Sequence, residues 1–208
     1  MKKYILFLAF ILVFPAMIFS QEYQQSSLKM ISDNASGELS DILRFEEIAY
    51  LKIKFIGEGL KNKSYSITAK EFKEGELVSD TVIIDSKRFP MLAHTVNDTI
   101  LGFNVIAKQI TDNKLKVMFR FDSFFVTREL NLIETKDTYS LRNLAKESKL
   151  PIKYDEPFYL LAYILPYDMG NGMKSYCAVG SNGTDAENWG QKFGVKHYIL
   201  FEMRFESN

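Results

Sequence analysis

The stretch PFYLLAYILP, residues 157–166, decides the fold class. It places an unbroken apolar run, Phe158 to Leu165, between Pro157 and Pro166. The run is too short to cross a membrane as a helix, which takes about 20 apolar residues. Aromatic and aliphatic residues bounded by prolines favour a strand. Because both faces of this strand are apolar, we expect either that neighbouring segments cover both faces or that an aromatic stripe contacts a partner.

The end of the chain predicts a second strand, over residues 197–205. Every second residue of this segment is apolar and points to one face: Ile199, Phe201, Met203 and Phe205. Glu202 and Arg204 point to the other face, which is typical of a half-buried strand. We expect this strand to be paired inside a sheet and to close the fold against residues 158–165.

Short alternating segments recur along the rest of the chain about every ten residues, a spacing typical of an antiparallel sandwich or barrel. They lie at residues 49–55, 65–69, 77–84, 102–110, 115–121, 124–133 and 138–144, with one more short strand between 166 and 197. Residues 74–76 indicate a hairpin turn, and residues 185–189 a single helical turn. We therefore predict an all-β fold, an antiparallel β-sandwich of roughly nine or ten strands, forming a single domain over residues 37–208.

The N-terminus predicts export. A basic start, Lys2 and Lys3, precedes an apolar run that ends at Phe19, and the sequence then turns polar. This is the pattern of a signal peptide, which we place at residues 1–20; the alternative is an uncleaved anchor. Residues 21–36 are polar and irregular, and we expect a flexible segment or a short helix at residues 28–31. The expected location is secreted or periplasmic, in the cell envelope.

Composition excludes several classes of function. Lys+Arg and Asp+Glu number 26 each, so the chain has no net field that would attract nucleic acid. The single cysteine, Cys177, allows no internal disulfide. No transmembrane span is expected once the signal peptide is removed.

Several strand motifs resemble a family of small secreted Bacteroidetes proteins of unknown function. The resemblance rests on these pieces: Arg44-Phe45-Glu46, residues 50–55, residues 65–71, residues 158–163 and residues 197–202. It implies a β-sandwich in the envelope or outside a Gram-negative bacterium. Because that family has no assigned activity, the resemblance implies no catalytic residues.

Catalytic and metal-binding residues are sparse. Cys177 and His197 lie on neighbouring expected strands and could form a nucleophile–base pair, but a buried thiol and a packed histidine fit their apolar surroundings better. Two histidines and one cysteine are too few for a typical zinc site. Residues 182–188 hold clustered Asn, Asp and Glu side chains, which could be a calcium site or a solvated turn. We therefore expect no catalytic residues, no metal and no cofactor.

Aromatic residues in the long connection before residue 197 are the best ligand candidates. Tyr167, Tyr176 and Trp189 could stack on sugar rings, while Asp185 could bind their hydroxyl groups. The alternative is that Trp189 is a plug folded over the edge of the core.

The expected function is a non-catalytic binding or assembly module of the cell envelope, with a glycan or another envelope protein as partner. One alternative is a secreted hydrolase acting on glycan or peptide. Another is a structural subunit whose exposed strand edge pairs with another protein.

Overall fold

The two strands singled out by the sequence lie side by side in one sheet. β9 (Phe158–Ile164) pairs antiparallel with β12 (His197–Glu206), with Leu161 opposite Phe201. The structure is a computed structural model that describes residues 28–88, 95–170, 172–176 and 183–207. The expected signal peptide therefore lies outside the described residues.

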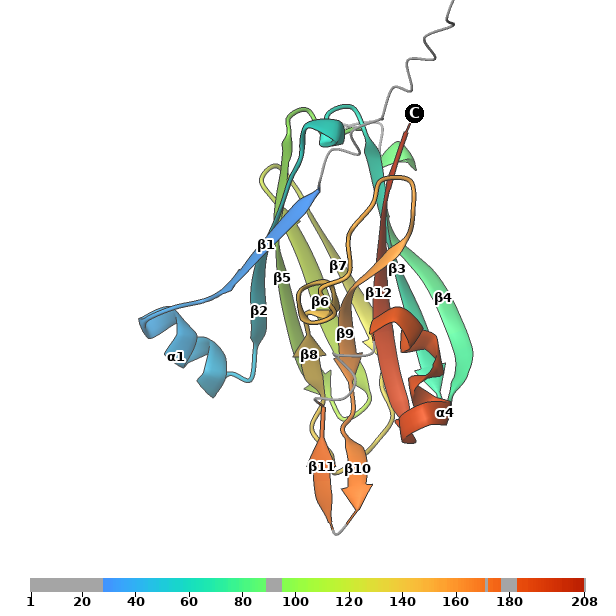
Figure 1. Ribbon diagram of the computed structural model, residues 1–208. Helices are drawn as coiled ribbons and strands as arrows, with labels where there is room; N and C mark the ends of the chain where they lie inside the picture. Colours follow the sequence, from blue (N-terminus) through green and yellow to red (C-terminus); the bar gives the residue numbers. More distant parts are fainter. Residues whose placement is uncertain (1–27, 89–94, 171, 177–182, 208) are drawn as a thin grey trace, which may run out of the picture.

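Two five-stranded antiparallel sheets form the body of the molecule (Figure 1). Sheet A has the order β1 (Lys29–Asn34), β2 (Ala49–Ile56), β5 (Ile100–Thr111), β6 (Lys114–Phe121), β7 (Phe125–Asn131). Sheet B has the order β4 (Glu76–Asp85), β3 (Ser64–Lys73), β12, β9, β8 (Ser140–Arg142). A small hairpin joins β10 (Tyr167–Gly170) to β11 (Met173–Ser175). The prediction of an all-β, sandwich-like single domain is confirmed.

Alternating side chains of the two sheets meet in the main core. In β6, Leu115, Val117 and Phe119 have no exposed surface, and in β12 Phe201 and Phe205 have none either. Edge-to-face ring contacts join the sheets: Phe119 to Phe201, with centroids 5.7 Å apart, and Phe55 of β2 to Phe205, 5.1 Å apart. Such contacts add to the free energy gained by removing the rings from water.

A second apolar cluster covers the outer face of sheet B. Ala162 and Ile164 of β9 and Leu200 of β12 point away from the main core, yet none of them is exposed. The covering elements are α2 (Leu144–Glu147), η3 (Gly183–Asn188) and α4 (Trp189–Phe193). β9 is therefore covered on both faces, which is the first of the two alternatives that the apolar run left open.

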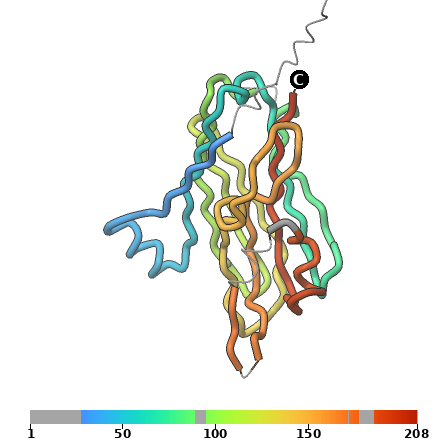
Figure 2. The backbone as a smooth tube through the Cα atoms, in the orientation of Figure 1, coloured from blue at the N-terminus to red at the C-terminus, as the bar shows by residue number. Residues whose placement is uncertain are grey.

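Two N-terminal elements differ from the sequence prediction. Lys29–Asn34 forms strand β1, paired antiparallel with β2, where we expected a flexible segment or a short helix. That expectation is wrong because an edge strand can be polar: only Met30 of this strand packs against the core. An unexpected helix, α1 (Glu38–Phe45), follows β1 and projects from the sheets (Figures 1 and 2).

The remaining elements are short. The 3-10 helices η1 (Glu58–Leu60) and η2 (Ser86–Arg88) lie in connections between strands. The described residues hold twelve strands, against nine or ten expected, because β1 and one strand of the β10–β11 hairpin were missed. In the part of the chain that the structure describes, every helix is too short or too polar to span a membrane.

Candidate functional site

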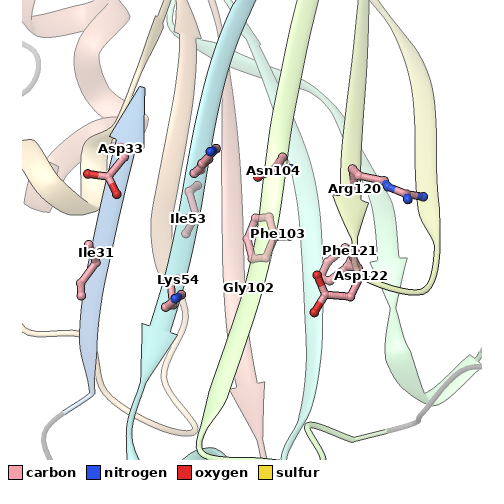
Figure 3. A pocket seen from close by; sticks show the side chains of 11 residues that line it. Ile31, Asp33, Ile53, Lys54, Gly102, Phe103, Asn104, Arg120, Phe121 and Asp122 are labelled. Carbon is pink, nitrogen blue, oxygen red and sulfur yellow. The ribbon is translucent and has the colours of Figure 1, made fainter. Parts of the chain in front are cut away.

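A shallow groove crosses the outer face of sheet A. It encloses about 690 Å³ and is lined by residues of β1, β2, β5 and β6 and by the turn that follows β6. Figure 3 shows Ile31 and Asp33 on β1, Lys54 on β2 and Arg120 near the end of β6. Gly102 of β5 lies opposite Lys54, and because it has no side chain the face is hollowed there.

One row of side chains runs straight across all five strands of sheet A. The strand registers place its members opposite one another in the order Asp33, Lys52, Asn104, Arg120, Phe125. Neighbouring strands lie about 4.8 Å apart, so the four intervals of this row span about 19 Å. The row thus presents charged and amide groups, and at one end an aromatic ring that is 58% exposed.

The cations in the groove have no partner among the described residues. The side chains of Lys52, Lys54 and Arg120 form neither an ion pair nor a hydrogen bond there. Two carboxylates, Asp33 and Asp122, line the same groove, so it offers acceptors as well as donors. Unpaired charges on an open face are available to a ligand without first breaking an internal pair.

The whole outer face of sheet A is cationic, although the chain as a whole is balanced. Its outward strand positions hold only two acids, Asp33 and Glu129. They hold seven bases: Lys29, Lys52, Lys54, Lys108, Lys114, Lys116 and Arg120. A positive face raises the local concentration of anionic ligands.

Trp189, the first of the ligand candidates from the sequence, has no exposed surface. It lies in the second apolar cluster, with its ring centroid 5.7 Å from that of Tyr198. The next residue, Gly190, touches the hairpin turn between β3 and β4, where an added Cβ would collide with the backbone of Gly75. Trp189 therefore packs over the edge of the core, as in the alternative given above, and does not form a surface contact.

Tyr167, Tyr176 and Asp185 are held by internal contacts. Tyr167 packs on Phe193 of α4, with centroids 5.6 Å apart. The hydroxyl of Tyr176 donates to the carbonyl of Thr138, and burial raises the pKa of this tyrosine. Both side chains are partly buried against the second cluster, and because Trp189 in that cluster has no exposed surface, the three rings do not form an exposed platform.

Asp185 forms an ion pair with Lys192 and accepts a hydrogen bond from Asn188. The hydrogen bond from Lys192 is the main cause that lowers the pKa of this carboxyl group. Glu187, three residues before Gly190, accepts hydrogen bonds from Lys70 and Tyr159. The acids of this turn are thus occupied by the protein itself.

His197 belongs to a buried polar network. Its Nδ1 accepts from the hydroxyl of Tyr139 at 2.8 Å, and its Nε2 donates to Glu71 at 3.2 Å. The Tyr139 hydroxyl also accepts from the backbone N–H of Ile133. Burial lowers the pKa of His197, which favours the neutral ring that this network needs. With both ring nitrogens occupied and no exposed surface, this side chain is a packed histidine.

Cys177 of the possible nucleophile–base pair and Asn182 of the possible calcium site lie outside the described residues. Among the residues that are described, no group of three or more His, Cys, Asp or Glu side chains could hold a metal ion.

Comparisons with protein-family models, with curated proteins and with solved structures gave no match. The proposed function therefore rests on the geometry of the outer faces of sheets A and B.

Sequence reasoning missed the groove on sheet A. The outward alternation of Lys52 and Lys54, and of Lys116 and Arg120, is visible in the sequence. What the sequence does not contain is the pairing order that sets β2 beside β5 and β5 beside β6.

Proposed function

We propose that this protein is an exported, non-catalytic binding and assembly module of the cell envelope that binds an acidic glycan on the outer face of sheet A. The observation that carries the proposal is the row from Asp33 to Phe125, in which Lys52 and Arg120 have no partner among the described residues. A row of about 19 Å suits an extended chain of several sugars.

The chemistry of the row fits sugar carboxylates and hydroxyls. Arg120 can bind a carboxylate through two parallel hydrogen bonds, and Lys52 and Lys54 add flexible positive charges. Asn104 and Asp33 can exchange hydrogen bonds with hydroxyl groups. Phe125 offers the apolar ring face on which a sugar can stack.

The spacing of the carboxylates favours binding over glycoside hydrolysis. Hydrolysis by paired carboxylates requires a separation of about 5–9.5 Å. Asp33 on β1 and Asp122 after β6 line the two sides of the groove, and three strand intervals separate them, about 14 Å. The two acids are too far apart to act on one glycosidic bond.

The binding experiment compares an acidic and a neutral polysaccharide, polygalacturonate and dextran, by isothermal titration calorimetry. We expect binding of polygalacturonate that weakens with added salt. Lys52→Ala with Arg120→Ala should weaken it about tenfold or more, since charge-assisted hydrogen bonds are lost. Lys61→Ala is the matched control, because Lys61 is exposed, lies in the turn after η1 and has no side-chain partner in the part of the chain that the structure describes. Equal binding by the two variants would remove sheet A from the proposal.

Export is tested separately. The mature N-terminus, read by mass spectrometry on envelope fractions, should begin at Gln21. An intact Met1 in a membrane-embedded protein would contradict the proposed location.

A further inference from the structure

Helix α1 exposes an apolar stripe to solvent. Leu39, Ile42 and Phe45 are 50%, 59% and 85% exposed, and no residue of the helix is buried. Three-residue spacing places these side chains along one side of a helix. Figures 1 and 2 show α1 projecting from the end of β1 and β2, away from both sheets.

A helix of this length needs a contact to hold it. α1 has eight residues, and isolated helices shorter than about 12–15 residues are marginal in water. Most helix stability in proteins comes from packing an apolar face, and here each side chain of the apolar stripe is at least half exposed. The ion pair of Glu46 with Lys108, at 3.0 Å, ties the end of α1 to β5 but leaves the stripe open.

Acidic residues surround this stripe. Glu38 and Asp41 lie in the first turn, Glu46 and Glu47 follow the last turn, and Arg44 is the one base from residue 38 to 47. This net negative charge is unfavourable at an anionic membrane surface. The matching surface would have an apolar centre and basic margins.

The outer face of sheet A has that pattern, one row beyond the groove. Half-buried Tyr50, Ile106 and Met118 lie opposite one another on β2, β5 and β6 and form an apolar row. On β6, Met118 stands between Lys116 and Arg120, both exposed. The row is thus flanked by cations on both sides, which complements α1 in polarity and in charge.

We propose that α1 docks on this apolar row in a second copy of the same chain. Because each copy carries both the helix and the row, a two-fold arrangement lets the two copies exchange helices and forms the contact twice. Each contact brings three exposed apolar side chains against half-buried ones, with acids facing Lys116 and Arg120. An interface of this extent belongs to the small class below about 1,200 Å² in total, so the dimer is a reversible one.

The proposal does not depend on glycan binding, with one exception. Arg120 belongs both to the groove and to the margin of the apolar row, so an acidic glycan and the second copy should compete for it. That competition rests on the proposed function, whereas dimer formation itself does not.

The first test is the oligomeric state. Sedimentation velocity of the purified mature protein over a wide concentration range should show a reversible monomer–dimer equilibrium. Ile42→Ser with Phe45→Ser should weaken dimer formation at least tenfold and leave the thermal midpoint of the sandwich unchanged. The matched control is Val78→Ser with Val82→Ser, which removes two exposed apolar side chains from the edge strand β4.

The second test is a charge exchange. One variant carries Glu38→Lys and Asp41→Lys on the helix, and the other carries Lys116→Glu and Arg120→Glu on the face. Each alone should stay monomeric, because like charges then meet in both contacts. An equimolar mixture should form heterodimers, because both contacts regain opposite charges.

Three results would overturn the proposal. The wild-type protein could stay monomeric at all concentrations, which would leave α1 without a second copy. The β4 variant could lose the dimer instead, which would place the contact at the sheet edge. The mixed charge variants could fail to associate, which would separate α1 from the sheet A face.

Discussion

The outer faces of the two sheets use similar residues in opposite ways. On sheet B, Lys70 pairs with Glu202 at 2.8 Å and with Glu187 at 3.1 Å, and η3 and α4 cover the apolar positions. On sheet A, Lys52 and Arg120 have no partner in the described chain, and the residues that line their groove come from strands and one turn, with none from a helix. The paired charges on sheet B, next to the helices that cover it, contribute to the fold. The open charges on sheet A, which have no partner in the described chain, remain available for binding.

The largest expected effect concerns β12, which lies between β3 and β9 in sheet B. A chain that ends before His197 loses four fully or almost fully buried side chains: Ile199, Phe201, Met203 and Phe205. At roughly 1.5–3 kcal/mol each, the loss is about 6–12 kcal/mol as an upper limit. A typical domain has about 5–15 kcal/mol in total, so we predict that residues 21–196 do not fold.

Urea unfolding followed by circular dichroism checks whether the 21–196 fragment folds. A cooperative transition in the 21–196 fragment would show that sheet B does not need its central strand.

The second prediction compares one aromatic residue from each outer face. Trp189→Ala on the sheet B side should destabilise the protein by about 3–5 kcal/mol, because a fully buried ring is lost. Phe125→Ala on the sheet A side should change stability by less than about 0.5 kcal/mol, because the ring is largely exposed. Chemical denaturation measures both. Similar losses of stability in the two variants would contradict the proposed difference between the two outer faces.

The third prediction concerns pH and His197, the first residue of β12 in sheet B. Its pKa is lowered in the folded state, chiefly by burial, so as pH falls the unfolded chain takes up the proton at a higher pH than the folded chain does. Stability should therefore decrease from pH 7.5 to pH 5.5. Charged neighbours are Glu71, which accepts from the ring, and Lys73, which opposes its protonation.

His197→Gln should flatten this pH dependence, since glutamine can donate and accept but does not titrate. The measurement is the free energy of unfolding at both pH values. If the free energy of unfolding changes equally with pH in wild type and variant, the pH dependence belongs to other groups.

The smallest effect is expected on sheet A. Lys52→Ala with Arg120→Ala should leave stability within about 0.5 kcal/mol of wild type, because neither side chain has a partner among the residues that the structure describes. The same variant should lose binding of the acidic glycan. A clear loss of stability would mean that these cations support the fold, and the contrast between the faces would disappear.

Local sequence pattern predicts much of this fold. The alternation in residues 115–121 and 197–205 has a period of two, so strand identity and the buried face can be read from neighbouring residues. β1 was not predicted because it is a polar edge strand.

The candidate site could not be read in the same way. Lys52, Asn104 and Arg120 are far apart in the sequence, and only strand pairing places them in one row. Trp189 stood out by its chemistry, but whether it is exposed depends on where η3 and α4 pack.

The most direct test maps the bound glycan onto the two faces. Backbone amide shifts of the labelled protein, recorded by NMR during titration with an acidic oligosaccharide, locate the contact by residue. The account predicts perturbations around Lys52, Asn104 and Arg120 and none across η3 and α4. Perturbations centred on Tyr167, Asp185 and α4, with sheet A unchanged, would contradict it.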